Sequence, residues 1–151
     1  MEYIGDIFRP PSEARSLLVQ VTVGCSHNRC TFCSMYARKK FHVKNWEKVQ
    51  ADLDEGLAQP YYDRLFLCDG DALVLSTDKL LRILRYVRDH GPHIKRVGVY
   101  GDARNVASKS VSELIELREA GLGIIYHGVE SGDDEVLKRI DKGADSAAQL
   151  E

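Results

Sequence analysis

Four apolar stretches alternate with four amphipathic stretches along this 151-residue chain. The second apolar stretch, Arg64–Cys68 (RLFLC), is uninterrupted after its arginine, as is typical of strands that are buried on both faces of a parallel sheet. The other expected strands are Leu17–Val23, Lys95–Tyr100 and Leu122–Val129. Because strands that alternate with helices imply right-handed crossover connections, the sequence predicts an α/β fold with a parallel sheet, either open or part of a (β/α) barrel.

The expected helices begin at residues that can cap a helix N-terminus. Asn45 precedes apolar residues at helical spacing, and Pro60 ends that pattern. A second helix is expected to begin near Ser76, and Ser110-x-x-Glu113 has the form of a capping box for the third. A short fourth helix follows the last strand, with acidic residues at its start and basic residues near its end, which complement the helix dipole.

Three of the four cysteines lie within nine residues, in the segment CSHNRCTFC that directly follows the first expected strand. The C-x4-C-x2-C spacing places Cys25, Cys30 and Cys33 on one short loop, where three thiolates can converge on an iron–sulfur cluster or on zinc. No fourth ligand lies nearby, so one coordination position remains open. A zinc site completed by His27 or His42 is an alternative, although zinc sites usually combine a C-x2-C pair with a second ligand pair, which this sequence lacks.

Composition bears on whether these cysteines form disulfides. The net charge is −2, and no apolar run approaches the roughly 20 residues that cross a bilayer. The N-terminus MEYIGDIFRPPSEARS has acidic residues early and no apolar core, unlike a signal peptide. We therefore expect a cytoplasmic protein without membrane association, whose clustered cysteines are metal ligands or catalysts. The near-neutral charge gives no indication of nucleic-acid binding.

Glycine and carboxylate residues follow three of the expected strands. They lie in Asp69-Gly70-Asp71, Tyr100-Gly101-Asp102 and Glu130-Ser131-Gly132. Ligands of parallel α/β folds bind beyond the carboxyl ends of the strands, which is where all these residues would meet the cysteine loop. Glycine permits close approach of the backbone, and carboxylates accept hydrogen bonds from ammonium and hydroxyl groups. The sequence therefore predicts a polar, zwitterionic small ligand that lies across the strand ends and touches a metal centre.

The cysteine loop and the later motifs resemble those of the radical S-adenosylmethionine (SAM) superfamily. The commonest spacing in that family is C-x3-C-x2-C, and this chain has one more residue between Cys25 and Cys30. The segments GCSHNRCTFCSMY, DGDALVLSTDKLL and GVESGDDEVLKRIDKG resemble the branch that contains the elongator catalytic subunit and the tRNA methylthiotransferases. The resemblance extends from Arg9 to Gly143. It implies a partial parallel (β/α) barrel of about four β–α units, with residues 1–151 as a single domain that forms the N-terminal portion of a radical SAM (β/α)6 barrel and is truncated at its C-terminus.

The resemblance also implies a role for each motif. The three cysteines would hold three irons of a [4Fe–4S] cluster, and the amino and carboxylate groups of SAM would chelate the fourth iron. Asp69-Gly70-Asp71 stands where the family usually has Gly-Gly-Glu, which binds the methionyl amino group. Phe32 would pack near the adenine, and Glu130 and Ser131 would contact the ribose or the methionine end. The expected cofactor-binding residues are thus Phe32, Asp69, Gly70, Asp71, Glu130 and Ser131.

The reaction implied by the resemblance is reductive cleavage of SAM to a 5′-deoxyadenosyl radical, which abstracts hydrogen from a substrate that the sequence does not identify. An electron donor resembling flavodoxin or ferredoxin is the expected partner. The alternative is an iron–sulfur or zinc-binding electron-transfer module that does not cleave SAM. No catalytic side chain is assigned from the sequence.

Four further features have ordinary structural interpretations. Cys68 is expected to be a buried strand thiol, and His127 is expected to point toward the covering helices. The basic run Arg38–Lys44 reads as a solvated loop, with pairing of one cation to the SAM carboxylate or to an anionic substrate as the alternative. Asp102 follows the third strand without a specific assignment.

Overall fold

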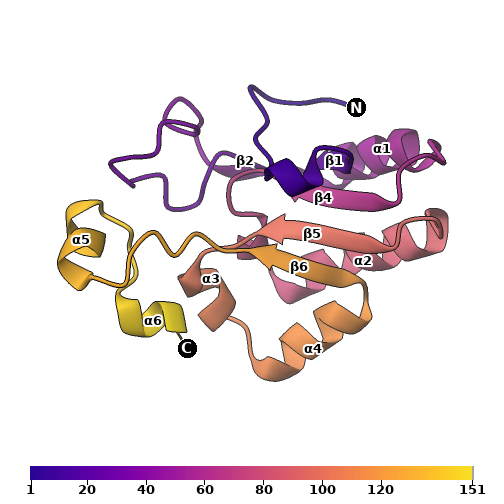
Figure 1. Ribbon diagram of the computed structural model, residues 1–151. Helices are drawn as coiled ribbons and strands as arrows, with labels where there is room; N and C mark the ends of the chain where they lie inside the picture. Colours follow the sequence, from indigo (N-terminus) through magenta and orange to yellow (C-terminus); the bar gives the residue numbers. More distant parts are fainter. Residues whose placement is uncertain (151) are drawn as a thin grey trace.

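The computed structural model describes residues 1–150 and contains a four-stranded parallel sheet. Its strands lie in the order β1-β4-β5-β6 and all point the same way (Figure 1). The predicted α/β fold with a parallel sheet is therefore confirmed. The strands are β1 (Leu17–Gln20), β4 (Arg64–Cys68), β5 (Arg96–Tyr100) and β6 (Leu122–Tyr126).

Helices connect consecutive strands of the sheet. Asn45 caps the first of them by accepting a hydrogen bond from the backbone N–H of Lys48, and Ser110 and Glu113 form the predicted capping box of α4. The shorter helix α3 and the helical turns η1 and η2 have no counterpart among the sequence predictions. The helices are α1 (Trp46–Leu57), α2 (Thr77–His90), α3 (Ala103–Ala107), α4 (Val111–Glu119), α5 (Asp134–Arg139) and α6 (Ser146–Leu150), with η1 (Pro11–Glu13) and η2 (Ala72–Val74) as 3-10 turns.

The first predicted strand, Leu17–Val23, is divided between two sheets. After β1 the chain continues into β2 (Thr22–Val23), which pairs antiparallel with β3 (His42–Val43). Val21 lies between them, because its N–H donates to Cys68 O on β4 while its carbonyl accepts from Lys44 N. The cysteine loop, residues 24–41, therefore leaves and returns through a small two-stranded sheet.

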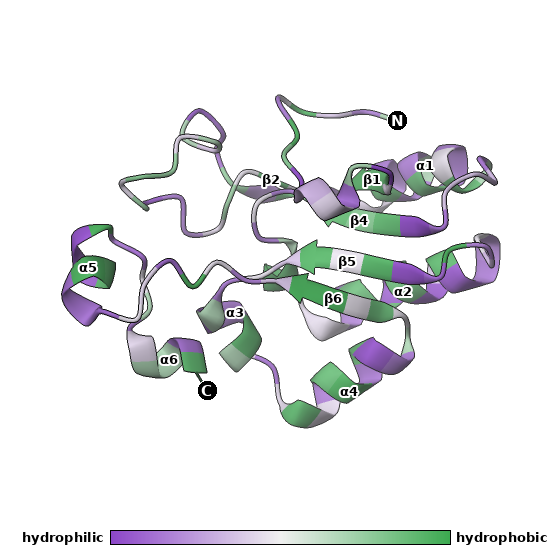
Figure 2. Cartoon of the chain, viewed as in Figure 1, coloured by the Kyte–Doolittle hydropathy of each residue, from purple (hydrophilic) through white to green (hydrophobic). Residues whose placement is uncertain are grey.

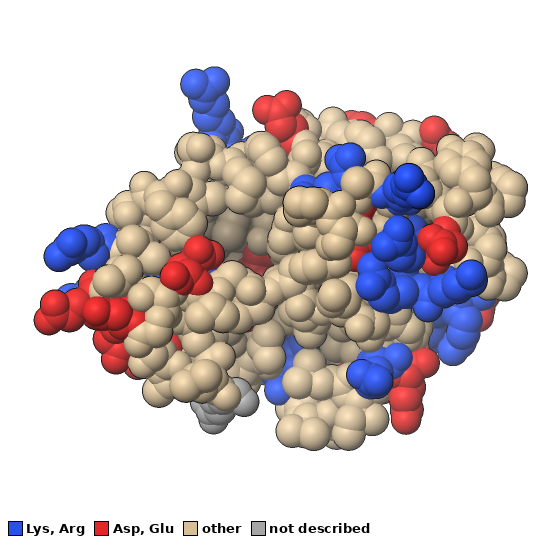
Figure 3. All heavy atoms as spheres, in the orientation of Figure 1, with Lys and Arg blue, Asp and Glu red and all other residues tan. Residues whose placement is uncertain are grey.

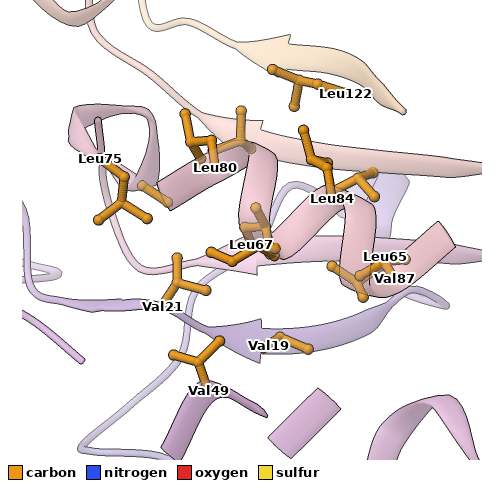
Figure 4. Packing of buried hydrophobic residues seen from close by; sticks show 14 of the residues in the cluster. Val19, Val21, Val49, Leu65, Leu67, Leu75, Leu80, Leu84, Val87 and Leu122 are labelled. Carbon is orange, nitrogen blue, oxygen red and sulfur yellow. The ribbon is translucent and has the colours of Figure 1, made fainter. Parts of the chain in front are cut away.

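The hydrophobic core lies on the face of the sheet that α1, α2 and α4 cover. Leu65 and Leu67 of β4 face Leu80, Leu84 and Val87 of α2 (Figure 4). The strands are hydrophobic over most of their length, whereas the helices mix hydrophobic and hydrophilic residues (Figure 2). Strands that are buried on both faces appear in the sequence as apolar runs, and helices that are buried on one side appear as amphipathic patterns. Both could therefore be predicted from the sequence.

The opposite face of the sheet is covered by the chain's first 16 residues. Tyr3 donates its hydroxyl hydrogen to Leu18 O at 2.9 Å, and Ile4 N donates to the Gln20 side chain at 2.8 Å. The fully buried Glu13 accepts from Arg96 at 2.5 Å and from the Tyr126 hydroxyl at 2.6 Å. The part of this segment around Glu13 is thus packed against the sheet, and it closes the base of the sheet's inner face.

The helices of residues 1–150 include none that is long and apolar enough to cross a membrane. This agrees with the absence of a long apolar run in the sequence.

Truncation of Leu53 to alanine should test the contact between α1 and the sheet. The Leu53 side chain is fully buried, so the substitution should lower the free energy of unfolding by about 2–5 kcal/mol through lost burial and a residual cavity. Urea denaturation followed by circular dichroism measures this change. Ile115→Ala on α4 is the matched control, because Ile115 is 52% exposed and should change stability by less than about 0.5 kcal/mol. Equal effects would contradict the assigned core.

Candidate functional site

A pocket of about 200 Å³ lies at the carboxyl ends of the parallel strands. Figure 1 shows the cysteine loop and α5 at this end of the sheet, beyond the arrowheads, and Figure 3 shows the surface hollowed here. Its lining includes groups that follow each of the four strands, together with residues of the cysteine loop and of the segment after α5. The lining residues are Cys25, His27, Cys30, Phe32, Cys33, Met35, Tyr36, Gly70, Asp71, Tyr100, Gly101, Asp102, Tyr126, Gly128, Glu130 and Lys142.

The three loop cysteines line this pocket as free, half-buried thiols. Burial raises the pKa of Cys25, and hydrogen bonds from the backbone of Asn28 and His27 oppose that shift. Burial likewise raises the pKa of Cys30, and the Lys142 ammonium opposes it. Within residues 1–150, no three His, Cys, Asp or Glu side chains are gathered closely enough to hold a single metal ion. The donor set of three thiols on one loop around one pocket fits a [4Fe–4S] cluster, in which each cysteine ligates a different iron.

The base of the cysteine loop is held by the fully buried carboxylate of Asp69. Its Oδ2 accepts from Gly24 N at 3.0 Å, from Lys39 Nζ at 2.9 Å and from Gln20 Nε2 at 3.3 Å. Gly24 has φ +74°, which favours glycine. A Cβ at this position would also lie only 3.1 Å from the Lys39 carbonyl oxygen. Gly24 and Lys39 stand at the two ends of the loop, so one carboxylate at the end of β4 joins both ends to the sheet.

This arrangement gives Asp69 contacts that differ from those expected of a SAM ligand. Its Oδ2 is directed at the loop base, and its neighbours Gly70 and Asp71 line the pocket instead. The expectation that the whole Arg38–Lys44 run is solvated is wrong for two of its lysines. Lys39 pairs with Asp69, and the buried Lys44 pairs with Asp52 at 2.7 Å. These two cations are engaged by carboxylates of the chain itself.

Asp71 lies in the pocket wall with only 1% of its surface exposed. One carboxylate oxygen accepts hydrogen bonds from Ser26 Oγ and from Asn105 Nδ2, the latter at 2.5 Å. Among residues 1–150 nothing donates to the other oxygen, Oδ1. Burial raises the pKa of Asp71 to about 6, and the Ser26 hydrogen bond opposes that shift. A buried carboxylate oxygen without a donor is costly, so Asp71 is suited to accept from a ligand's ammonium group.

Aromatic rings form the remaining walls. The Tyr36 ring packs on Gly70, where a side chain would collide with it, and its other neighbour is Phe8 at 5.5 Å between ring centroids. Phe32, expected near the adenine, lines the pocket and is 54% exposed. Tyr100 and Tyr126 lie side by side on β5 and β6, with centroids 6.2 Å apart. The pocket therefore offers planar apolar walls as well as a carboxylate.

The segment after β6 contributes one of the two predicted groups to the pocket. Glu130 lines it and lies 3.3 Å from Lys142 Nζ. Ser131 does not belong to the lining, and its hydroxyl accepts a hydrogen bond from Asp133 N at the start of α5. Asp133 in turn caps α5. The structure thus places Glu130 in the site and Ser131 in the turn that follows it.

The structure also places Cys68, His127 and Asp102. Cys68 is fully buried, as predicted, and burial raises the pKa of its thiol. His127 bonds Gly101 O at 3.1 Å and faces α3, α4 and α6, as predicted from strand alternation. Asp102 caps α3 by accepting from Asn105 N at 3.0 Å.

Sequence reasoning missed Lys142, Tyr36 and Asn105 as pocket or pocket-supporting residues. They lie outside the strand-end triplets, and no spacing pattern marks them. Asn105 belongs to α3, which was not predicted, and Lys142 enters the pocket only because the chain turns back after α5. Their positions depend on tertiary contacts between distant segments.

A parallel α/β sheet with three thiols and a buried carboxylate at its carboxyl edge is the arrangement expected of an α/β domain of the iron–sulfur class. The profile of the radical SAM superfamily matches residues 19–151, which is most of the chain. The protein therefore belongs to the radical SAM superfamily, whose members bind a [4Fe–4S] cluster and SAM.

Two solved structures have a similar fold. The first is the cobalamin-dependent S-adenosylmethionine radical enzyme OxsB with aqua-cobalamin and S-adenosylmethionine bound, with a TM-score of 0.71 and 20% sequence identity. The second is OxsB with aqua-cobalamin bound, with a TM-score of 0.68 and 22% identity. Each match covers 88% of this chain but only 21% of OxsB. At this identity the likeness bears on the fold, and it confirms the predicted partial (β/α) barrel. No curated protein gives a significant match to the sequence.

Breaking the Asp69–Lys39 pair should destabilise the domain. Asp69→Asn leaves the Lys39 ammonium without its buried partner, so we expect a loss of about 3–5 kcal/mol in the free energy of unfolding. The double variant Asp69→Asn with Lys39→Met removes both charges and should recover part of that loss. Chemical denaturation of the metal-free protein measures both. Additive losses in the double variant would contradict a direct coupling between the two side chains.

Proposed function

We propose that this chain binds a [4Fe–4S] cluster through Cys25, Cys30 and Cys33 and binds SAM beside it. The observation that carries the proposal is that the three thiols and the buried, donor-free oxygen of Asp71 line the same pocket. SAM presents an amino group and a carboxylate at its methionine end, and an open coordination position on the cluster would accept both. Asp71 would accept a hydrogen bond from the amino group, in the place where the family has glutamate.

The other pocket residues have complementary tasks in this proposal. Gly70 lets the Tyr36 ring lie directly against the backbone at the pocket wall, where a Cβ would collide with it. Phe32 offers an apolar face for the adenine, and Glu130 offers acceptors for hydroxyl groups. Asp69 would act indirectly, by holding the loop that carries the cysteines. Ser131 would shape the turn that presents Glu130.

When bound and reduced, the cluster would supply the electron that cleaves SAM to a 5′-deoxyadenosyl radical. The chain's own contribution is to hold the ligand's ends and to exclude water from the reacting atoms with the rings of Tyr36, Tyr100 and Tyr126. Because the reaction consumes an electron, we propose an electron donor resembling flavodoxin or ferredoxin as a partner. Such donors and labile clusters favour a reducing compartment, so we propose a cytoplasmic location.

The order of the three motifs supports a place near the branch of the elongator catalytic subunit and the tRNA methylthiotransferases. We further propose that residues 1–151 form the N-terminal portion of a radical SAM core. The chain spans about a fifth of the length of OxsB. The substrate of the whole protein would be set by later loops and by other domains, since a fold does not specify a substrate.

Anaerobic reconstitution with iron and sulfide should test the cluster and SAM together. We expect about four irons per chain and an electron paramagnetic resonance signal of the dithionite-reduced cluster that shifts when SAM is added, because SAM chelates the unique iron. Cys30→Ala should lose the cluster, whereas Cys68→Ala is the matched control and should keep it, since Cys68 lies in the buried strand.

The same titration separates the alternatives. A cluster whose signal is unchanged by SAM would support an electron-transfer module instead. Binding of zinc without assembly of any cluster would refute the proposal. Formation of 5′-deoxyadenosine under reducing conditions would extend it from binding to cleavage.

The pH dependence of SAM binding should report on Asp71. Burial raises the pKa of Asp71 to about 6, so the carboxylate is mostly protonated at about pH 5 and ionised at about pH 7.5. A charged acceptor is worth about 1.5–3 kcal/mol to a hydrogen bond, so we expect the unmodified chain to bind SAM roughly 10- to 100-fold more tightly than Asp71→Asn at pH 7.5. This ratio should fall toward one at pH 5. Anaerobic equilibrium binding measures it, and a ratio that does not change with pH would exclude Asp71 as the acceptor.

A further inference from the structure

Two segments that lie more than 100 residues apart meet at the outer side of the pocket. One is the tip of the cysteine loop, and the other is the strap, defined here as Ile140–Gly143, which directly follows α5. Figure 1 shows the loop and α5 at the same end of the sheet. Within residues 1–150, β1 and β6 are the two edges of the sheet and do not pair with each other. The loop after β1 and the strap after β6 therefore connect the two edges of the sheet, although the edge strands themselves do not pair.

Polar contacts of three residues, Thr31, His27 and Arg29, join the loop tip to the strap. Thr31 N donates to Ile140 O at 2.9 Å, and His27 Nε2 lies 2.6 Å from Asp141 O. Because a carbonyl oxygen only accepts, Nε2 is the donor in this bond. Arg29 Nε lies 3.8 Å from an Asp141 carboxylate oxygen at the surface. The His27 side chain is 4% exposed, so its hydrogen bond is shielded from water while the Arg29 pair is not.

The strap has a backbone that suits this contact. Gly143 has φ +78°, and a Cβ there would lie 2.6 Å from Cε1 and 3.1 Å from Nδ1 of the His27 ring. Glycine therefore permits both the turn and the close approach of the imidazole. Asp141 N and Lys142 N bond back to Lys138 O and Leu137 O at the end of α5. The strap is thus continuous with the C-terminal turn of α5 rather than an independent loop.

The contact also determines which groups face each other across the pocket. Cys30 lies between Arg29 and Thr31, both of which contact the strap. Lys142 lies in the strap, and its ammonium enters the pocket and meets Glu130. Movement of the loop tip away from the strap would change the separation of Cys30 from Lys142 and Glu130.

We propose that His27 is a positioning residue that holds the loop tip on the strap and so sets Cys30 against the pocket wall formed by Lys142 and Glu130. The importance of this position for a cluster rests on the proposed function. The contact itself belongs to the metal-free chain and can be measured there.

Limited trypsin digestion of the metal-free protein should detect the contact, because cleavage after Arg29 requires the loop tip to open. His27→Leu removes the donor to Asp141 O, which is worth about 1 kcal/mol, so cleavage after Arg29 should become about fivefold faster. His27→Gln retains an N–H donor and should stay within about twofold of the unmodified chain. His90→Leu is the control, since His90 is an exposed histidine on α2, remote from the pocket.

A second pair of variants tests the strap side. Gly143→Ala should accelerate cleavage after Arg29 at least as much as His27→Leu, because a Cβ would both strain the backbone and displace the imidazole. Gly132→Ala is the matched control, since a Cβ there would meet no atom within 4 Å. Cleavage after Lys79 and Arg82 in α2 serves as the internal measure of global unfolding.

Two results would overturn the proposal. One is an unchanged rate after Arg29 in both His27→Leu and Gly143→Ala. The other is a rate that rises equally after Arg29 and in α2, which would mean that the contact supports global stability rather than the position of the loop. In the reconstituted chain, His27→Leu should lose iron to a chelator about fivefold faster, and His27→Gln should restore retention. If the unmodified chain forms no cluster, the proposed function fails, while the digestion still decides whether His27 holds the loop.

Discussion

The site depends on one buried ion pair. Asp69, at the end of β4, accepts from the backbone of Gly24 and from the Lys39 ammonium with the same carboxylate oxygen. Since these residues lie at the two ends of the cysteine loop, the end of β4 determines where the loop begins and ends. A buried charge pair is costly to break because the remaining partner is left without water or a counter-charge. The 18-residue cysteine loop has little regular structure, and this ion pair fixes the positions of its two ends.

The pocket combines this base with support from the opposite edge of the sheet. The strap after α5 holds the loop tip through His27 and Thr31, so the cysteines lie between two fixed points. The inner face of the sheet below them is closed by the N-terminal segment, where Glu13 joins Arg96 and Tyr126. The four strands alone would leave the pocket open. The cysteine loop, the strap and the N-terminal segment cover its sides.

Polar groups in the pocket are divided between those that support the fold and those that are available to a ligand. Lys39, Asp102 and the Oδ2 atom of Asp69 are occupied by contacts within the chain. Asp69 and Asp71 each keep one buried oxygen, Oδ1, that has no donor among residues 1–150, and of these two residues only Asp71 lines the pocket. A larger hollow on the helical surface, about 550 Å³ between α1 and α2, is lined by groups such as Arg82 and Trp46, which pack against each other, and none of its lining residues, all within residues 1–150, has a buried polar atom without a partner. The candidate site is distinguished by the three thiols and the donor-free carboxylate oxygen that share one pocket, rather than by its size.

The sequence by itself determined the parallel α/β fold, the helix caps at Asn45 and Ser110, and the loop that carries Cys25, Cys30 and Cys33. Apolar periodicity, capping chemistry and ligand spacing are local properties, so they can be read within a few residues. Only the tertiary structure decided that Asp69 supports the loop while Asp71 lines the pocket. It also decided that Lys142, more than 100 residues after the cysteines, enters the same pocket and pairs with Glu130. Two carboxylates separated by one glycine look alike in a sequence, and their roles diverge because each meets partners brought from elsewhere by the fold.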